Sequence, residues 1–294
     1  MFFTDWEGCW VLNDFAYELT MAVFNNDRFY RVLSEYDDHL AYTIKKPGYE
    51  AGYTVKLVVP FLIAAKVRNS FVLEFAKKVV KFVRDAKDSI EILKKFEPVV
   101  LSTSYVHFLK VSAEMLGIKR IHGTEVDFDL EVDSEILKEV DRIASSRFEE
   151  IEEIFSRKEV LDVLEKIKVV GAGEKAKILR NYCEEFNVDF PIAVGDSISD
   201  YKMFDAAKEL GGVAIAFNGN EYALKHADIA IISESALSEA LVIKKLIETK
   251  KVESLADIKI PGEIYFLEKC DFEKVLRKSK KMRVKIRSKA GELS

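Results

Sequence analysis

Short runs of mainly apolar residues recur along the chain. They cover residues 1–4, 98–101, 191–195, 212–217 and 228–232. Runs of this length and composition predict strands that are buried on both faces of a sheet. From residue 98 onward, segments with apolar residues at helical spacing separate these runs, such as Val106, Leu109, Ala113 and Leu116. Alternating strands and helices predict an α/β fold whose parallel sheet is covered by helices on both faces.

Two stretches interrupt this alternation. Residues 14–92 lie between the first two expected strands, are too long for a crossover and look mainly helical, so they predict an inserted domain. A second stretch, about 123–168, begins with an alternation that predicts a half-exposed strand and continues into a charged helical pattern. Its apolar positions are Val126, Phe128, Leu130 and Val132, and its acidic positions are Asp127, Asp129, Glu131 and Asp133. Such acids are typical of a solvated strand face, and a metal cluster is the alternative interpretation.

Composition narrows the class of protein. The chain has 294 residues, of which 49% are hydrophobic and 32% charged, which suits a globular protein with a sizeable core. The three cysteines, Cys9, Cys183 and Cys270, are scattered and form no C-x-x-C pair, so we expect neither a disulfide framework nor a cysteine zinc site. Such cysteine usage suits a reducing compartment, and we expect a cytoplasmic location. The longest apolar stretch has nine residues, whereas a membrane span needs roughly 20. We expect neither a membrane span nor a secretory signal.

Charge is distributed unevenly. The net charge of −5 argues against general nucleic-acid binding. Residues 271–294, however, contain nine Lys or Arg and three Asp or Glu. This basic segment is either a terminal extension that folds back on the acidic body or an arm that binds an acidic partner.

Polar residues follow three of the expected strands. The first strand is followed by Asp5-Trp6-Glu7-Gly8, the second by Ser102-Thr103-Ser104 and the third by the run from Asp196 to Asp200. A helix begins near Lys175. Ligands bind at the carboxyl ends of the strands in parallel sheets, so we expect these segments to converge at one edge.

The side chains in this set suit phosphoryl transfer. The Asp5 carboxylate can attack phosphorus and form an aspartyl-phosphate intermediate. A phosphate dianion would be repelled by Asp5 and Asp196, so the site needs a hard cation, and two carboxylates with phosphate and water oxygens suit Mg²⁺. Glu7 is a candidate general acid for the leaving oxygen and then a base for water.

Other residues in the set would hold the phosphate. Ser102 with nearby backbone N–H groups would bind a phosphate oxygen, and Thr103 and Ser104 compete for that role. Lys175 would neutralise charge on the phosphoryl oxygens, with Lys177 as its rival on the same helix. Asp200, with Ser199 beside it, would orient Lys175 or a metal-bound water.

These motifs together resemble those of the haloacid dehalogenase-like hydrolases. The resemblance rests on Asp5-x-Glu7 after an N-terminal strand, Ser102 at the end of an apolar strand, Lys175 in Lys-Ala-Lys-Ile-Leu, and Ala-Val-Gly-Asp-Ser-Ile-Ser-Asp at 193–200. Met203-Phe204 and the run 214–218 make the archaeal phosphoserine phosphatase branch the most similar. By pattern the match covers residues 1–13, 98–122 and 170–235.

The resemblance implies a Rossmann-like core and a Mg²⁺-dependent phosphohydrolase acting on a small phosphorylated metabolite. It implies a core of residues 1–13 and 93–245 with a smaller insertion at about 123–168, a helical cap of residues 14–92, and a basic extension of residues 246–294. It also implies a metal-ligand role for the Glu7 backbone carbonyl. Tyr49, Tyr53 and Arg68 are then candidate substrate contacts in the cap. The oligomeric state is left open.

One departure from the family pattern opens an alternative function. The family's usual second acid is Asp, whereas this chain has Glu7, which is longer by one methylene. Misplacement of about 1 Å can cost roughly a hundredfold in rate. A catalytically weak or inactive phosphate-binding or structural protein is therefore the alternative interpretation.

A second alternative rests on a glycine-rich run. Residues 171–176, Gly-Ala-Gly-Glu-Lys-Ala, fit the looser dinucleotide fingerprint G-x-G-x-x-A and open a helix after an apolar segment. Taken alone, Gly171 and Gly173 would indicate a dinucleotide-dependent oxidoreductase. That interpretation leaves Asp5, Glu7 and Asp200 without a role.

Overall fold

A central sheet organises the molecule. The computed structural model describes residues 1–288 and 291, and within that part of the chain seven strands have the order β3-β2-β1-β4-β5-β6-β7. All neighbouring strands are parallel except β7, which is antiparallel to β6. The predicted α/β fold is therefore confirmed. The strands are β1 (Phe2–Thr4), β2 (Pro98–Tyr105), β3 (Arg120–Thr124), β4 (Ile192–Gly195), β5 (Val213–Phe217), β6 (Ile229–Ile232) and β7 (Glu263–Phe266).

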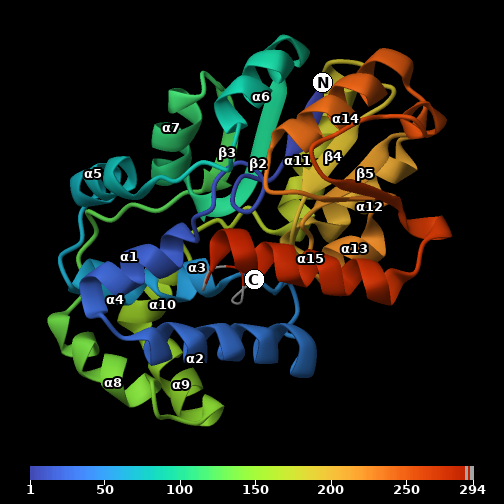
Figure 1. The fold of residues 1–294 in the computed structure, drawn as a ribbon. Coiled ribbons are helices and arrows are strands. Elements are labelled where there is room, and N and C mark those ends of the chain that lie inside the picture. The colour runs from blue at the N-terminus through green and yellow to red at the C-terminus, as the bar shows by residue number, and fades with distance from the viewer. Residues whose placement is uncertain (289–290, 292–294) are drawn as a thin grey trace.

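Consecutive strand residues serve different cores, as a pleated strand requires. Phe2 packs into the core on one face of the sheet and Phe3 into the core on the other face. Helices α6, α7 and α14 cover the first face, and α11, α12, α13 and α15 cover the second (Figure 1). Their bounds are α6 (Ala86–Leu93), α7 (Val106–Met115), α11 (Ala172–Glu185), α12 (Tyr201–Glu209), α13 (Glu221–His226), α14 (Leu237–Thr249) and α15 (Phe272–Arg287).

Residues from both predicted insertions pack together. The first supplies α1 (Phe15–Phe24), α2 (Asp27–Asp38), the π-helix His39–Thr43, α3 (Thr54–Leu57), α4 (Val59–Ala64) and α5 (Asn69–Val79). The second supplies the 3-10 helix Ser134–Lys138, α8 (Glu139–Ile143), α9 (Phe148–Phe155) and α10 (Lys158–Leu164). Helices α8 and α10 pack against α2 and α4, and the ring of Phe155 lies 5.8 Å from Tyr36 and 6.1 Å from Phe61. We propose that the two segments form one helical cap, without α6, which packs on α14 at the sheet.

The expected half-exposed strand at residues 126–132 is wrong. Within the described chain this stretch has loop and turn conformation. Its acids contact the start of α5: Nδ2 of Asn69 donates to Asp127 Oδ1 at 2.9 Å and to Asp129 Oδ2 at 2.8 Å. Glu131 pairs with Arg68 at 2.7 Å. The alternation arises because apolar side chains pack inward while the acids bind polar groups of the cap, so it marks an interface between two segments of the chain.

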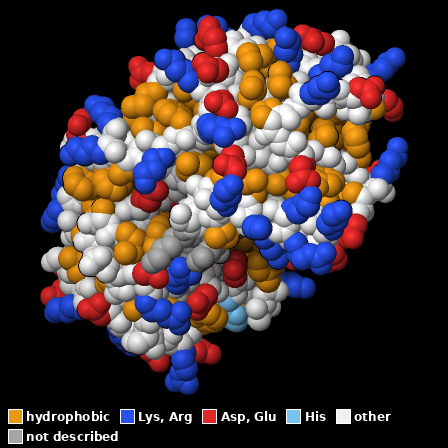
Figure 2. Space-filling model, viewed as in Figure 1, with side chains coloured by type: hydrophobic (Ala, Val, Ile, Leu, Met, Phe, Trp, Pro, Cys, Tyr) orange, Lys and Arg blue, Asp and Glu red, His pale blue; other side chains and the backbone are white. Residues whose placement is uncertain are grey.

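The basic segment packs on the core. Strand β7 extends the sheet beyond β6, and α15 then runs back across the molecule between the sheet and α2 (Figure 1). Asp271 caps α15 through a hydrogen bond from the backbone N–H of Lys274, and Val275 and Leu276 are buried beneath the helix. Lysine and arginine side chains gather on the surface over α15 (Figure 2). Among the described residues, no helix is both long and apolar enough to cross a membrane.

Candidate active site

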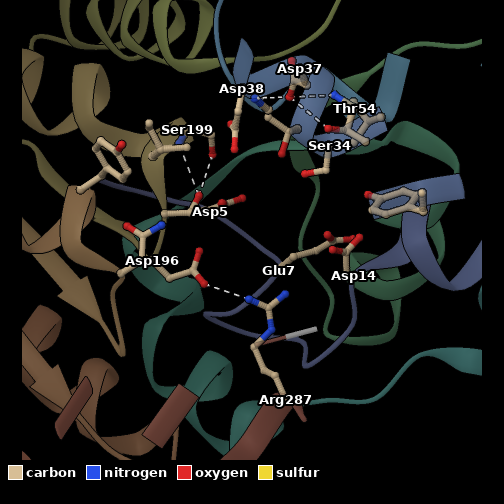
Figure 3. Close-up of a pocket in the computed structure, with 18 of the residues that line it drawn as sticks. Asp5, Glu7, Asp14, Ser34, Asp37, Asp38, Thr54, Asp196, Ser199 and Arg287 are labelled. Atoms are coloured by element: carbon tan, nitrogen blue, oxygen red, sulfur yellow. Dashed lines mark hydrogen bonds and ion pairs between the residues drawn. The ribbon is translucent and has the colours of Figure 1, made fainter. Parts of the chain in front are cut away.

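Four charged side chains meet at the carboxyl ends of β1 and β4. Thr4 pairs with Val194, so Asp5 and Asp196 follow neighbouring strands at levels one residue apart. Nζ of Lys175, from the first turn of α11, lies 3.1 Å from Asp5 Oδ2 and 2.7 Å from Asp200 Oδ1. The structure thus brings together residues that are up to 195 positions apart in the sequence, and Figure 3 shows Asp5 and Asp196 at this place.

A tight turn after β4 holds Asp200. Its Oδ2 accepts hydrogen bonds from the backbone N–H groups of Asp196 and Ser197, both at 3.0 Å. Ser199 accepts a hydrogen bond from Lys175 Nζ at 3.0 Å. Burial raises the pKa of Asp200 to about 7, although the Lys175 charge opposes this. Burial alone would lower the pKa of Lys175, but the carboxylates of Asp200 and Asp5 outweigh it and hold the pKa above its usual value, so the ammonium stays charged.

The helical position decides between the two candidate lysines. Lys175 is fully buried, whereas Lys177 is exposed and lies 3.6 Å from Glu174 on the same helix. Two residues correspond to about 200° around a helix, so only one of the two side chains can face the sheet.

Glu7 lines the same cavity as Asp5, but its carboxyl group is held by other residues than those that hold Asp5. Its Oε1 accepts hydrogen bonds from Ser104 Oγ at 2.7 Å and from the backbone N–H of Phe15 at 3.1 Å. Burial raises the pKa of Glu7 well above its usual value, and the neighbouring Asp14 raises it further. Both effects favour the protonated form of the carboxyl group.

The three hydroxyl residues expected after the second strand lie inside β2, near its carboxyl end, and differ in their surroundings. Thr103 lines the cavity. Ser102 is buried, and its Oγ accepts a hydrogen bond from the backbone N–H of Ser104 at 3.3 Å. The hydroxyl of Ser104 is occupied by Glu7. Of the three candidates, Thr103 is the one that reaches the cavity.

Two arginines from α15 also enter the site, and sequence reasoning missed them. Nη1 of Arg283 lies 2.6 Å from Asp196 Oδ2, and Nη1 of Arg287 lies 3.1 Å from the same oxygen. Both guanidinium groups are also held by carbonyls, Arg283 by Asp196 and Asn218, and Arg287 by Leu12 and Asn13. The sequence contains one hint of this arrangement: the two arginines are four residues apart in a basic helical segment, which places both on one face of the helix.

Gly8 leaves room for this contact. Its φ of +86° lies in the left-handed region that favours glycine. A Cβ built on Gly8 would lie 1.9 Å from Asp196 Oδ2 and 3.0 Å from Arg287 Nη1. Any larger residue at this position would displace the Asp196 carboxylate.

The cavity above Asp5 has a volume of about 290 Å³, and six acidic residues contribute to its wall. Asp14, Asp37 and Asp38 line it from the cap side, and Arg287 lines it from the C-terminal helix (Figure 3). Asp37 Oδ2 accepts hydrogen bonds from Gly52 and Thr54, and burial raises the pKa of Asp37 to about 6.

A second cavity of about 320 Å³ adjoins the first. The two share Tyr42, Ile198 and Tyr222 in their walls. The Tyr42 ring from the cap and the Tyr222 ring from the core stack with centroids 6.0 Å apart. Tyr49 lines the second cavity, whereas Arg68 binds Glu131 and lies outside both.

A cap carboxylate lies at the glycine-rich start of α11. The backbone N–H of Gly173 donates to Glu50 Oε2 at 2.9 Å, and Glu50 also pairs with Lys202 at 2.5 Å. A Cβ at Gly171 or Gly173 would approach Glu50 to 3.0 Å or 2.8 Å. The position where a dinucleotide phosphate would bind is thus occupied by Glu50.

The acidic cluster fits a hard divalent cation. One oxygen from each of Asp5, Asp196 and Asp200 lies within 4.8 Å of the others, and within the described chain this is the one group of potential ligands so arranged. Carboxylate oxygens are the ligands that Mg²⁺ prefers. The side-chain hydrogen bonds that Asp196 accepts from described residues end on Oδ2, which leaves Oδ1 for a cation.

Similar proteins are found among solved structures, while no protein-family model and no curated protein matches the chain. The gene product AF1437 from Archaeoglobus fulgidus is 56% identical and has a TM-score of 0.96, and the match covers 100% of this chain and 98% of that one. A phospho-aspartyl intermediate analogue of phosphoserine phosphatase is 14% identical with a TM-score of 0.53, over 84% of this chain and 96% of that one. A HAD family hydrolase from Salmonella enterica serovar Typhi is 11% identical with a TM-score of 0.55, over 77% of this chain and 65% of that one. The protein belongs to the same family as the Archaeoglobus gene product and has the haloacid dehalogenase-like fold that it shares with the phosphoserine phosphatases.

Proposed function

We propose that the protein is a Mg²⁺-dependent phosphatase that hydrolyses a small phosphate monoester through an aspartyl-phosphate on Asp5. The observation that carries this proposal is the setting of the Asp5 carboxylate. Its Oδ1 accepts the backbone N–H of Trp6 at 2.7 Å, and its Oδ2 lies 3.1 Å from Lys175. The carboxylate is thus held in one orientation at a cavity of a size suited to a small ligand.

The reaction then proceeds in two displacements. An Asp5 oxygen attacks phosphorus, the bond from phosphorus to the ester oxygen breaks, and Glu7 gives its proton to the leaving oxygen, which departs as an alcohol. Water next attacks the phosphorus of the aspartyl-phosphate while Glu7 takes up a proton, which releases inorganic phosphate and restores Asp5. The raised pKa of Glu7 supports its role as the proton donor.

The remaining residues stabilise charge. Lys175 faces the phosphoryl oxygens from the Asp5 side, and Asp200 and Ser199 keep its ammonium in place. Thr103 and Ser102 are proposed to bind a phosphate oxygen, and Thr103 is the one of the two that lines the cavity. Mg²⁺ held by Asp5, Asp196 and the Glu7 carbonyl would supply the positive charge that lets a phosphate dianion approach two carboxylates.

Hydrolysis assays test the proposal. Purified protein is incubated with p-nitrophenyl phosphate and a panel of phosphorylated metabolites, with Mg²⁺ present and after chelation. We expect Mg²⁺-dependent release of phosphate that Asp5→Asn abolishes without loss of folding. A beryllium fluoride adduct should form on wild-type Asp5 and not on the variant. Hydrolysis that survives Asp5→Asn would refute the assigned nucleophile.

A phosphate-binding protein with little or no turnover is the second candidate. The contact of two guanidinium groups with Asp196 and the use of Glu7 in place of the usual Asp favour it. This candidate predicts that wild-type protein binds inorganic phosphate but releases none from any ester in the panel. Measurable Mg²⁺-dependent turnover would exclude it.

A further inference from the structure

The C-terminal helix contributes charges to the site that the proposed reaction does not use. Arg283 and Arg287 lie on one face of α15, and both are almost fully buried. Each places Nη1 within 3.1 Å of Oδ2 of Asp196, a proposed metal ligand. Arg287 also lines the cavity that holds Asp5, so its charge acts on anything bound there (Figure 3).

The arginines change the charge balance of the site. Asp5, Asp196 and Asp200 provide three carboxylates, and among the described residues Lys175 is the one cation outside α15 that pairs with any of them. With Arg283 and Arg287, the cations equal the carboxylates in number. A cluster balanced in this way attracts a lone divalent cation less strongly and a phosphate dianion more strongly than the same carboxylates alone.

The other acids near Arg287 do not cancel this effect. Glu7 and Asp14 lie on the opposite side of the guanidinium from Asp196 (Figure 3). The ion pair of Arg287 is formed with Asp196, at 3.1 Å.

We propose that Arg283 and Arg287 of the C-terminal helix set the order of loading at the Asp196 site: they weaken binding of a divalent cation alone and strengthen binding of the phosphoryl group. The site then takes up cation and phosphate together. The inference rests on the proposed function only for the choice of Mg²⁺ and phosphate as ligands. Both arginines act through Asp196 or through their charge and are positioning residues.

Two binding measurements on Arg287→Gln test the inference without turnover. Isothermal titration calorimetry gives the affinity for Mg²⁺ without phosphate, and for inorganic phosphate after metal is removed. We expect Arg287→Gln to bind Mg²⁺ at least about tenfold more tightly and phosphate at least about tenfold more weakly than wild type, because one positive charge beside Asp196 is lost. A purely structural role would weaken both.

Two further variants serve as controls. One tests whether the charge or the shape of the Arg287 side chain matters, and the other tests whether loss of a charge elsewhere on α15 has the same effect. Arg287→Lys keeps the charge and should bind both ligands within about threefold of wild type, since the charge dominates at this range. Arg277→Gln removes an exposed charge from the same helix and should change neither affinity. Circular dichroism checks that each variant is folded.

The outcomes distinguish this inference from the proposed phosphatase. If both affinities fall or neither changes in Arg287→Gln, or if Arg287→Lys behaves like Arg287→Gln, the inference is refuted even where hydrolysis is observed. If wild type binds no Mg²⁺ in the absence of phosphate and Arg287→Gln does, the inference holds, and only hydrolysis that persists after chelation would refute the Mg²⁺ dependence of the phosphatase. If neither protein binds Mg²⁺, the inference is refuted.

Discussion

Nζ of Lys175 lies 3.1 Å from Oδ2 of Asp5, and both side chains are almost entirely shielded from solvent. The same nitrogen lies 2.7 Å from Asp200, so one ammonium bridges two buried carboxylates. A buried charge is tolerated when it is paired and hydrogen-bonded. The cation therefore both supports the fold locally and prepares the site for an anionic ligand.

Replacing Lys175 should damage stability and activity together. Lys175→Met leaves Asp5 and Asp200 without their shared cation, and removing one partner of a buried pair typically costs about 3–5 kcal/mol. We expect that loss in urea unfolding and a fall in phosphatase rate of at least about a hundredfold. The matched control is Lys177→Met on the same helix, where the side chain is exposed. Equal effects of the two substitutions would contradict the assigned role of Lys175.

Glu7→Gln should reveal proton donation to the leaving group. The amide keeps the length of Glu7 and an oxygen that can accept from Ser104 and Phe15, but it cannot transfer a proton. We expect a loss of about 10²- to 10⁴-fold with an alkyl phosphate, whose leaving oxygen needs a proton. With p-nitrophenyl phosphate the loss should be much smaller, because nitrophenolate leaves without one. Steady-state kinetics on both substrates measures the difference, and equal losses would assign Glu7 a structural role only.

Gly8→Ala should displace the Asp196 carboxylate. The added Cβ would lie 1.9 Å from Asp196 Oδ2, so the carboxylate must move. We expect weaker Mg²⁺ binding and a fall in activity of at least about tenfold. Gly48→Ala is the control, because Gly48 also has a positive φ of +73° but has no atom within 4 Å of the added carbon. If both variants lose activity equally, backbone strain and not the contact with Asp196 is responsible.

We predict that Glu239 on α14 lowers the free energy of unfolding at pH values above 4.5, the usual pKa of a Glu side chain. Among the described residues neither of its carboxyl oxygens has a hydrogen-bond partner, and burial raises the pKa well above 4.5, with Asp196 adding to the shift. The unfolded chain binds fewer protons at Glu239 once pH exceeds about 4.5, so this group's stabilisation is lost as pH rises toward the folded pKa, by up to about 1.4 kcal/mol per pH unit.

Glu239→Met should remove that pH dependence. We expect the free energy of unfolding at pH 7 to increase by about 1–3 kcal/mol, because a buried carboxyl without partners is replaced by an apolar side chain of similar size. The gain should shrink as pH falls toward 4.5. Glu248→Met on the exposed side of the same helix controls for the loss of one acid. A variant less stable than wild type at pH 7 would indicate a stabilising role for Glu239.

The pattern along the chain determined the core fold and which residues follow its strands. Apolar runs predicted β1, β2, β4, β5 and β6, because strands buried on both faces must be apolar throughout. Parallel strands end at a common edge, so Asp5, Asp196 and Lys175 were expected to meet, and the structure brings them together. Short edge strands carry no such signal: β3 and β7, where Glu263 is exposed, were not predicted.

Only the tertiary structure decided what surrounds these residues. The alternation at Val126–Val132 is also compatible with a loop packed against the cap, since a period of two says which side chains point inward and not what they pair with. The charge of residues 271–294 was visible in the sequence, but its partner was not. The contact of Arg283 with Asp196 spans 87 residues and depends on the path by which β7 and α15 return across the sheet. The charge composition shows that the chain has basic and acidic groups that can form ion pairs. The course of the backbone determines which two groups come close enough to do so.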